Sequence, residues 1–194
     1  MQLYKEQKYG KCDLNFEEPS SKLMYYISYL ITKKININPN LITTARLVIM
    51  FIVYYLLYKN YKILAGLLYL LCFFFDHLDG EMSRQHNTNS LFGDYYDHFV
   101  DIFYELPVFI FLYYKYIYDK SFYLYLIIFL IILINSTILV FFQEDKINEN
   151  NSKVKSSILG TLNFFKNYNC KNISILKYFG QGLLHLFVFF LIIL

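Results

Sequence analysis

The chain has 194 residues, of which 57% are hydrophobic and 17% are charged, whereas a soluble domain carries about 25% charged residues. This composition excludes a soluble globule, a disordered chain and a disulfide-rich scaffold. The net charge of +3 gives no reason to expect nucleic acid as a partner, and the three cysteines at unrelated spacings predict no cysteine-based metal site. We expect an all-α, polytopic membrane helical bundle.

Residues 1–38 are expected to form a cytoplasmic N-terminal segment. The first part of this segment is polar and has no apolar run of the kind that a secretory signal peptide carries. Residues 22–34 are a short apolar stretch between lysines, too short to cross a bilayer. This pattern predicts an N-terminal helix that lies in the membrane interface. Residues 39–194 are predicted to form one transmembrane domain.

The transmembrane domain contains five long apolar segments. They are residues 41–58, 61–75, 102–118, 121–142 and 178–194. The first carries only one charge, Arg46, and a polar turn at Lys59 and Asn60 separates it from the second. Pro107 predicts a kink in the third segment. Because residues 158–165 are apolar but too short for a further span, we expect about five to six transmembrane helices.

The distribution of basic residues predicts the orientation of these helices. With the N-terminus in the cytoplasm, the basic residues left on the outer side are Lys59, Lys62, Lys115 and Lys120. The positive-inside rule favours this arrangement. It places residues 76–101 at the cytoplasmic ends of the second and third spans. We therefore expect an integral membrane protein, of the endoplasmic reticulum or of a bacterial inner membrane, whose acidic region faces the cytoplasm.

Acidic side chains gather between residues 76 and 105. On a helix, one arc of about 100° would contain Asp94, Asp97, His98, Asp101 and Glu105. Asp76 and Asp79, three residues apart, would share a face of the preceding helix. A carboxylate at membrane depth costs about 2.5–3.5 kcal/mol on insertion scales, so the cluster needs neutralisation. Carboxylates without cysteine favour hard divalent cations such as Mg²⁺ or Mn²⁺.

Two glycines and an arginine lie among these acids. We expect Gly80 to let the backbone turn and approach a ligand closely, and Gly93 to open the next helix. Arg84 offers a planar fork for phosphate oxygens. A solvated helix end, paired with Arg84 and lysines, would explain any single acid. The combination instead favours a diphosphate held by metal ions.

The acidic segment resembles the signature of the CDP-alcohol phosphotransferases, D-x2-D-G-x2-A-R-x8-G-x3-D-x3-D. The corresponding residues are Asp76, Asp79, Gly80, Ser83, Arg84, Gly93, Asp97 and Asp101. All spacings fit, and the one departure is Ser83, which stands where the family has alanine. Residues 39–43, with the sequence PNLIT, similarly resemble the P-N-x-[IL]-T opening of the family's first spanning helix.

The resemblance implies a helical catalytic domain over residues 39–194 that acts in phospholipid biosynthesis. Such an enzyme transfers the phosphoalcohol part of a CDP-alcohol to the hydroxyl of a lipid or small-alcohol acceptor and releases CMP. Two Mg²⁺ or Mn²⁺ ions would be held by Asp76, Asp79, Asp97 and Asp101. Contacts with the CDP-alcohol would come from Asn40, Gly80, Arg84 and Gly93. A homodimer is a further expectation.

The acceptor hydroxyl needs a catalytic base, and two residues compete for this role. Asp101 corresponds to the usual candidate in the bacterial-type branches of the family. The eukaryotic choline and ethanolamine phosphotransferases instead have a histidine directly after the third aspartate, where this chain has His98. His98 therefore favours a choline/ethanolamine phosphotransferase-like activity. The alternatives are a CDP-diacylglycerol-dependent phosphatidyltransferase with an inositol or glycerophosphate acceptor, and a non-enzymatic divalent-cation transporter.

The other histidines are expected to have lesser roles. His77 is predicted to lie at the membrane interface and His86 in the loop between the second and third spans. His185 is predicted to be a hydrogen-bonded packing residue of the last helix.

Overall fold

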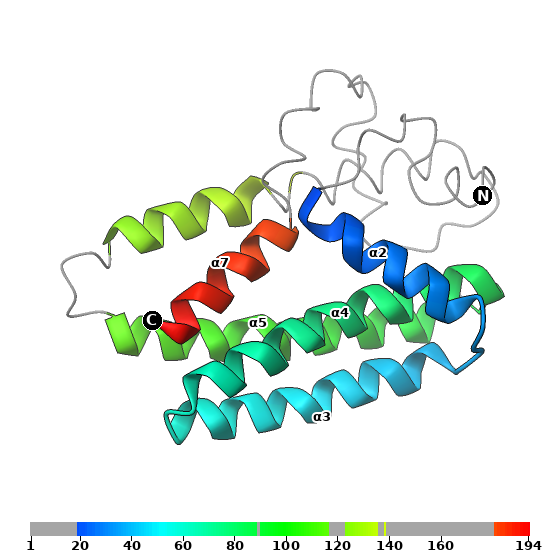
Figure 1. The fold of residues 1–194 in the computed structure, drawn as a ribbon, viewed down its shortest axis with the longest axis horizontal. Coiled ribbons are helices and arrows are strands. Elements are labelled where there is room, and N and C mark those ends of the chain that lie inside the picture. Colours follow the sequence, from blue (N-terminus) through cyan, green and yellow to red (C-terminus); the bar gives the residue numbers. More distant parts are fainter. Residues whose placement is uncertain (1–18, 89, 117–122, 136–137, 139–180) are drawn as a thin grey trace.

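The computed structural model describes residues 19–88, 90–116, 123–135, 138 and 181–194 (Figure 1). Its elements in these ranges are α2 (Pro19–Thr32), α3 (Pro39–Tyr58), α4 (Lys62–His86), α5 (Leu91–Tyr116), the helix Tyr123–Asn135 and α7 (Gln181–Ile193). No strand occurs in the described part of the chain, so the predicted all-α class is confirmed there.

Three long helices, α3, α4 and α5, form the body that positions the acidic segment. α3 packs against both α4 and α5, while α2 and α7 pack against α4 from the other side (Figure 1). The acids of the sequence signature lie on the C-terminal part of α4 and the N-terminal part of α5. The N-terminal half of α3 therefore lies against the region where these acids meet.

Local signals explain where α3 begins and ends. Asn38 is the N-cap, its side chain accepts a hydrogen bond of 3.0 Å from the backbone N–H of Asn40, and Pro39 occupies the first turn. The helix ends at Tyr58, and Asn60 then adopts a left-handed conformation with φ of 62°. Asparagine tolerates this conformation better than most residues. The predicted polar turn at Lys59 and Asn60 is confirmed.

The core is formed by apolar side chains that recur every three or four residues along each helix. Its buried members include Met50, Val53, Leu57, Ala65, Cys72, Val108, Leu112, Leu184, Val188 and Leu191. A polar group also lies in this core: His185 Nδ1 is 2.8 Å from the hydroxyl of Tyr69, and the hydroxyl of Tyr104 donates to the carbonyl of Tyr69 at 3.1 Å. His185 is thus the hydrogen-bonded packing residue that the sequence predicts.

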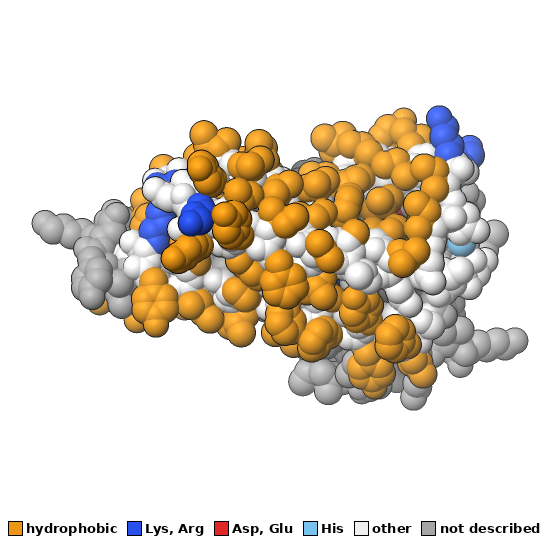
Figure 2. Space-filling model, turned by 90° about the horizontal axis from the view of Figure 1, so that it is seen from below, with side chains coloured by type: hydrophobic (Ala, Val, Ile, Leu, Met, Phe, Trp, Pro, Cys, Tyr) orange, Lys and Arg blue, Asp and Glu red, His pale blue; other side chains and the backbone are white. Residues whose placement is uncertain are grey.

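The outer face on the α3 side is covered by hydrophobic side chains, with lysine and arginine visible only toward its two ends (Figure 2). Exposed apolar residues of α3 include Leu41, Val48, Phe51, Ile52 and Tyr55. By length and composition, two helices of the described residues, α3 and α4, are long and apolar enough to cross a membrane.

The five to six predicted spans are not confirmed. α5 carries acids along its first half, and α7 has 13 residues, about 20 Å of helix against a bilayer core of about 30 Å. The helix Tyr123–Asn135 is also short. Parts of the predicted segments 102–118, 121–142 and 178–194, and all of residues 158–165, lie outside the described residues.

The N-terminal helix α2 lies across the end of α4 that carries the acids. The backbone carbonyl of Thr32, the last residue of α2, is 3.0 Å from His86 Nε2, and the ring centroids of Tyr25 and His77 are 4.4 Å apart with the rings tilted by 32°. His77, expected at the membrane interface, is buried inside the protein between Tyr25 and Phe73. His86, expected in the loop, is the last residue of α4, and Asn87 is the C-cap of that helix.

Candidate metal and nucleotide site

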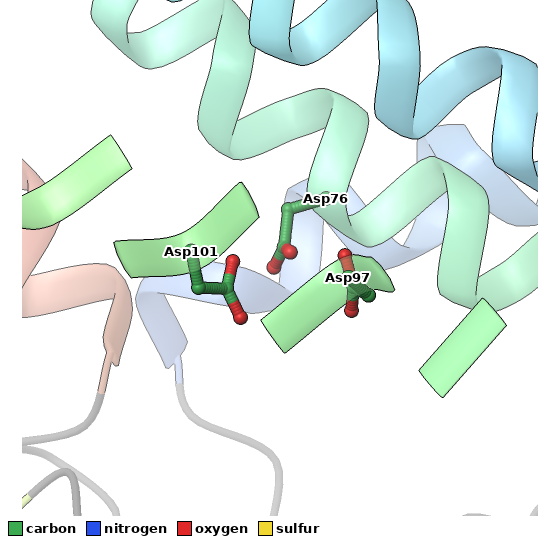
Figure 3. Close-up of side chains that lie close together, drawn as sticks. All are labelled: Asp76, Asp97 and Asp101. Atoms are coloured by element: carbon green, nitrogen blue, oxygen red, sulfur yellow. The ribbon is translucent and has the colours of Figure 1, made fainter. Parts of the chain in front are cut away.

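Three carboxylates converge where α4 meets α5. Asp76, Asp97 and Asp101 each offer an oxygen, and these oxygens all lie within 4.8 Å of one another. Figure 3 shows the carboxylate of Asp76, from α4, between those of Asp97 and Asp101, from α5. The two residues of α5 share a face because they are four residues apart. The side chains of the three aspartates are 28–40% exposed, so the cluster is open on one side.

Arg46 of α3 closes the buried side of this cluster. One terminal nitrogen of its guanidinium donates to Asp97 Oδ1 at 2.8 Å and to Asp101 Oδ1 at 2.9 Å, and the other donates to Asp76 Oδ1. The Arg46 side chain is 1% exposed. From the sequence we noted Arg46 only as the single charge of the first span. A single charge in an apolar helix usually faces a functional interior. The position of Arg46 in such a helix could therefore have identified it as a candidate site residue.

Asp79 lies outside the group of three. Its Oδ2 accepts a hydrogen bond of 2.6 Å from the hydroxyl of Thr43, and both side chains are buried. The contact directs Asp79 toward α3, one helical turn from Asp76. The structure thus groups three of the four predicted metal ligands and holds the fourth beside them, and the complete set of four stays a prediction.

Gly80 lies within α4, and the expectation that the backbone turns there is wrong. The helical hydrogen bonds continue past it to His86, and α4 ends at Asn87, whose φ of 52° is left-handed. Gly80 instead leaves room for a neighbour: a Cβ added there would lie 3.3 and 3.4 Å from the terminal nitrogens of Arg84. The absence of a side chain lets the Arg84 guanidinium lie back along α4, where a terminal nitrogen is 3.5 Å from Glu81 Oε2.

Gly93 brings the beginnings of α3 and α5 together. It is the third residue of α5, which confirms that it opens this helix. A Cβ added at Gly93 would lie 3.2 Å from Asn40 Oδ1 and 3.0 Å from Ser90 Oγ. One turn further along each helix, the hydroxyl of Thr44 is 3.0 Å from that of Tyr96. The two predicted nucleotide contacts, Asn40 and Gly93, are therefore neighbours.

His98 lies beside the cluster on α5. Its Nδ1 is 3.8 Å from Asp101 Oδ2, and its Nε2 is 3.8 Å from Asp94 Oδ1. These distances are longer than hydrogen bonds. His98 and Asp101 are both 40% exposed, so the two candidate bases are accessible from outside the bundle.

The cluster has the chemistry of a site for a hard divalent cation. Its ligand atoms are carboxylate oxygens, which Mg²⁺ and Mn²⁺ prefer, and no cysteine or histidine belongs to the group found among the described residues. A positive group already lies among these oxygens, because the Arg46 guanidinium touches all three carboxylates. The residues therefore fit the metal that the sequence signature implies.

Comparison of the sequence with known proteins identifies a family. The family model of the CDP-alcohol phosphatidyltransferases matches residues 36–193, which is most of the chain and includes every predicted site residue. A search of curated proteins and a search of solved structures each gave no match. Members of the family are transferases of substituted phosphate groups in phospholipid synthesis, are generally metal-dependent and are typically associated with membranes. The chain belongs to the CDP-alcohol phosphatidyltransferase family.

Proposed function

We propose that this protein transfers the phosphoalcohol group of CDP-choline or CDP-ethanolamine to the hydroxyl of a lipid acceptor and releases CMP. The observation that carries this proposal is the convergence of Asp76, Asp97 and Asp101 from two helices. These are signature positions of a family that transfers substituted phosphate groups.

The aspartates and their neighbours bind the donor. Asp76, Asp79, Asp97 and Asp101 would hold two divalent cations, whose positive charge would screen the diphosphate and stabilise the leaving oxygen of CMP. Arg84, lying over Gly80, donates to phosphate oxygens through its planar fork. Asn40 and Gly93 contact the nucleotide part at the junction of α3 and α5.

His98 or Asp101 accepts the proton of the acceptor hydroxyl. The acceptor oxygen attacks the β-phosphorus in line with the bond to the leaving group. A new bond forms between that oxygen and the β-phosphorus, and the bond from the β-phosphorus to the CMP oxygen breaks. Because the acceptor oxygen attacks the phosphorus directly, no covalent intermediate with the protein is required.

A lipid acceptor would reach the protein from the membrane. The apolar outer face of α3 suits contact with lipid chains, and the exposed lysines at its ends suit the headgroup regions. We propose that residues 39–194 form the membrane-embedded catalytic domain, that residues 1–38 form a cytoplasmic segment with an interfacial helix, and that the aspartates face the cytoplasm.

Two observations favour this activity over the alternatives. His98 directly follows Asp97, as in the choline and ethanolamine enzymes that the sequence resembles, and it lies within 4 Å of Asp101. A divalent-cation transporter would need acids distributed along the membrane normal, whereas oxygens of the three carboxylates lie within 4.8 Å of one another in a single cluster.

A panel of donors tests the proposal. The full chain would be purified into lipid nanodiscs that contain diacylglycerol and incubated with Mg²⁺ or Mn²⁺ and CDP-choline, CDP-ethanolamine or CDP-diacylglycerol. CDP-diacylglycerol would be paired with inositol and with glycerol phosphate. We expect CMP and a new phospholipid, identified by mass spectrometry, from CDP-choline or CDP-ethanolamine. CMP from CDP-diacylglycerol alone would assign the alternative donor, and no CMP from any donor would overturn the proposal.

A further inference from the structure

Arg46 is the only arginine or lysine in the described part of the chain that forms an ion pair with the three-carboxylate cluster. Two histidines also lie near it: His77 Nδ1 is 3.7 Å from Asp76 Oδ2, and His98 Nδ1 is 3.8 Å from Asp101 Oδ2. The guanidinium of Arg46 makes ion pairs with all three carboxylates, each through Oδ1. It reaches them from α3, a helix that contributes no carboxylate to the cluster. The contact therefore ties three helices together through one buried charge.

The charges in this cluster do not balance. One guanidinium faces three carboxylates, and Asp79 lies one turn away. Like charges at such separations repel strongly when they are partly removed from water. Without Arg46, the three carboxylates would need protons or a metal ion to stay within 4.8 Å of one another. The Arg46 guanidinium therefore offsets part of the repulsion that would drive the three carboxylates apart.

The same contact opposes a metal ion. A divalent cation would coordinate oxygens of the carboxylates that already accept hydrogen bonds from Arg46. A guanidinium and a metal ion on neighbouring carboxylate oxygens would repel each other, and the 1% exposure of Arg46 leaves little water to screen that repulsion. The Nε of Arg46 is also buried and has no hydrogen-bond partner among the described residues. One terminal nitrogen of Arg46 also donates to the backbone carbonyl of Asp97 at 3.4 Å. The other hydrogen bonds of the guanidinium within the described residues go to the three carboxylates that a metal ion would bind.

We propose that Arg46 competes with a divalent cation for these aspartates: its guanidinium holds Asp76, Asp97 and Asp101 together through their Oδ1 atoms and would give up these contacts on metal binding. Arg46 is in this sense a positioning residue that competes with the metal ion. The role assigned to it rests on the proposed function, because both require a divalent cation at these aspartates.

Manganese titration of the full chain in nanodiscs tests the competition, with free Mn²⁺ measured by electron paramagnetic resonance. We expect Arg46→Gln to bind Mn²⁺ at least tenfold more tightly than the wild type. It should unfold at a lower temperature in chelator and recover in Mn²⁺. Arg46→Lys keeps the positive charge and should stay within about threefold of the wild-type affinity. Lys59→Gln, which removes an exposed cation at the other end of α3, is the matched control and should change neither quantity.

A second measurement leaves Arg46 unchanged and guards against a variant that does not fold. The chain contains two arginines, Arg46 and Arg84, so a protein labelled with ¹⁵N-arginine gives two guanidinium signals, and Arg84→Lys assigns them. We expect slow hydrogen exchange at the terminal nitrogens of Arg46 without metal and fast exchange in saturating Mg²⁺. An unchanged Arg46 signal, or an Arg46→Gln protein that is folded in Mn²⁺ but binds the ion no more tightly, would overturn the role of Arg46.

The outcomes separate this inference from the proposed function. Mn²⁺ binding that tightens in Arg46→Gln, without CMP release from any donor, supports the competition and contradicts only the enzymatic proposal. CMP release by the wild type without tighter binding in Arg46→Gln contradicts only the role of Arg46. Absence of Mn²⁺ binding to both proteins overturns the role of Arg46 as well as the metal assignment.

Discussion

The hydroxyl of Thr43 donates a hydrogen bond of 2.6 Å to a carboxylate oxygen of Asp79, and both side chains are buried. Thr43 belongs to the PNLIT stretch that opens α3, and Asp79 to the acidic signature on α4. The two sequence motifs therefore meet through one short contact. Partners of this kind, which hold a metal-binding carboxylate in place, typically affect metal affinity or activity by 10- to 100-fold.

Thr43→Val should lower the rate of CMP release by about 10- to 100-fold, because valine keeps the shape of threonine but leaves Asp79 without its donor. Thr43→Ser restores the hydroxyl and should recover most of the rate. Thr44→Val, which removes the neighbouring exposed hydroxyl that contacts Tyr96, is the control and should have a smaller effect. Equal rates for the wild type and Thr43→Val would show that Asp79 needs no such support.

Asp97→Asn should abolish CMP release and leave the protein folded. The amide has nearly the shape of the carboxylate, but it cannot supply a negative charge to a metal ion. Size-exclusion chromatography and thermal unfolding check the fold, and radiolabelled CMP measures turnover. Asp94→Asn removes an acid of the same helix that lies outside the three-carboxylate group and should keep more than a tenth of the wild-type rate. Substantial turnover by Asp97→Asn would remove Asp97 from the metal ligands.

His98→Ala should reduce the rate by about 10² to 10⁴ if His98 is the general base. A loss smaller than tenfold would assign proton transfer to Asp101 instead, whose carboxylate lies 3.8 Å from the imidazole. His86→Ala removes a histidine that contacts the backbone of α2 and is the control for general effects of losing an imidazole. Steady-state rates at saturating donor and acceptor distinguish the two assignments.

Local sequence pattern determines some contacts of the acidic cluster and leaves others undetermined. The convergence of Asp97 and Asp101 follows from helical spacing, because residues four apart share a face. The prediction that Asp76 lies near them came from the resemblance to a known signature, since spacing alone does not determine how two helices face each other. Arg46 was missed for the same reason: the sequence shows a lone charge but not the rotation of α3 that directs it to the acids.

The predicted backbone turn at Gly80 is wrong, although it follows from the conformational propensity of glycine. Glycine favours turns, yet the backbone stays helical from Lys62 to His86, and the left-handed residue that ends α4 is Asn87. The glycine serves packing instead, because it leaves space for the Arg84 guanidinium. The burial of His77 depends on α2 folding back over α4, a tertiary contact that no local pattern reports.

Gly80→Ala tests the space left for Arg84. The new Cβ would lie 3.3 Å from a guanidinium nitrogen, and the flexible side chain must move. We expect the KM for the CDP-alcohol to rise by up to about tenfold, the cost of a weakened charge-assisted contact, with a smaller change in kcat. Gly66→Ala on the same helix is the contrast, because its Cβ would press on Phe189 at 3.0 Å. It should lower thermal stability and leave the KM unchanged.

The location of bound Mn²⁺ tests the central claim most directly. Crystals of the protein grown with Mn²⁺ and CDP would be measured at an energy where manganese scatters anomalously. We predict anomalous peaks within coordination distance of Asp76, Asp97 and Asp101, with Asp79 completing the ligand set beside the CDP diphosphate. Carboxylates that point away from one another, with no manganese between α4 and α5, would contradict the proposed metal site and the enzyme built on it.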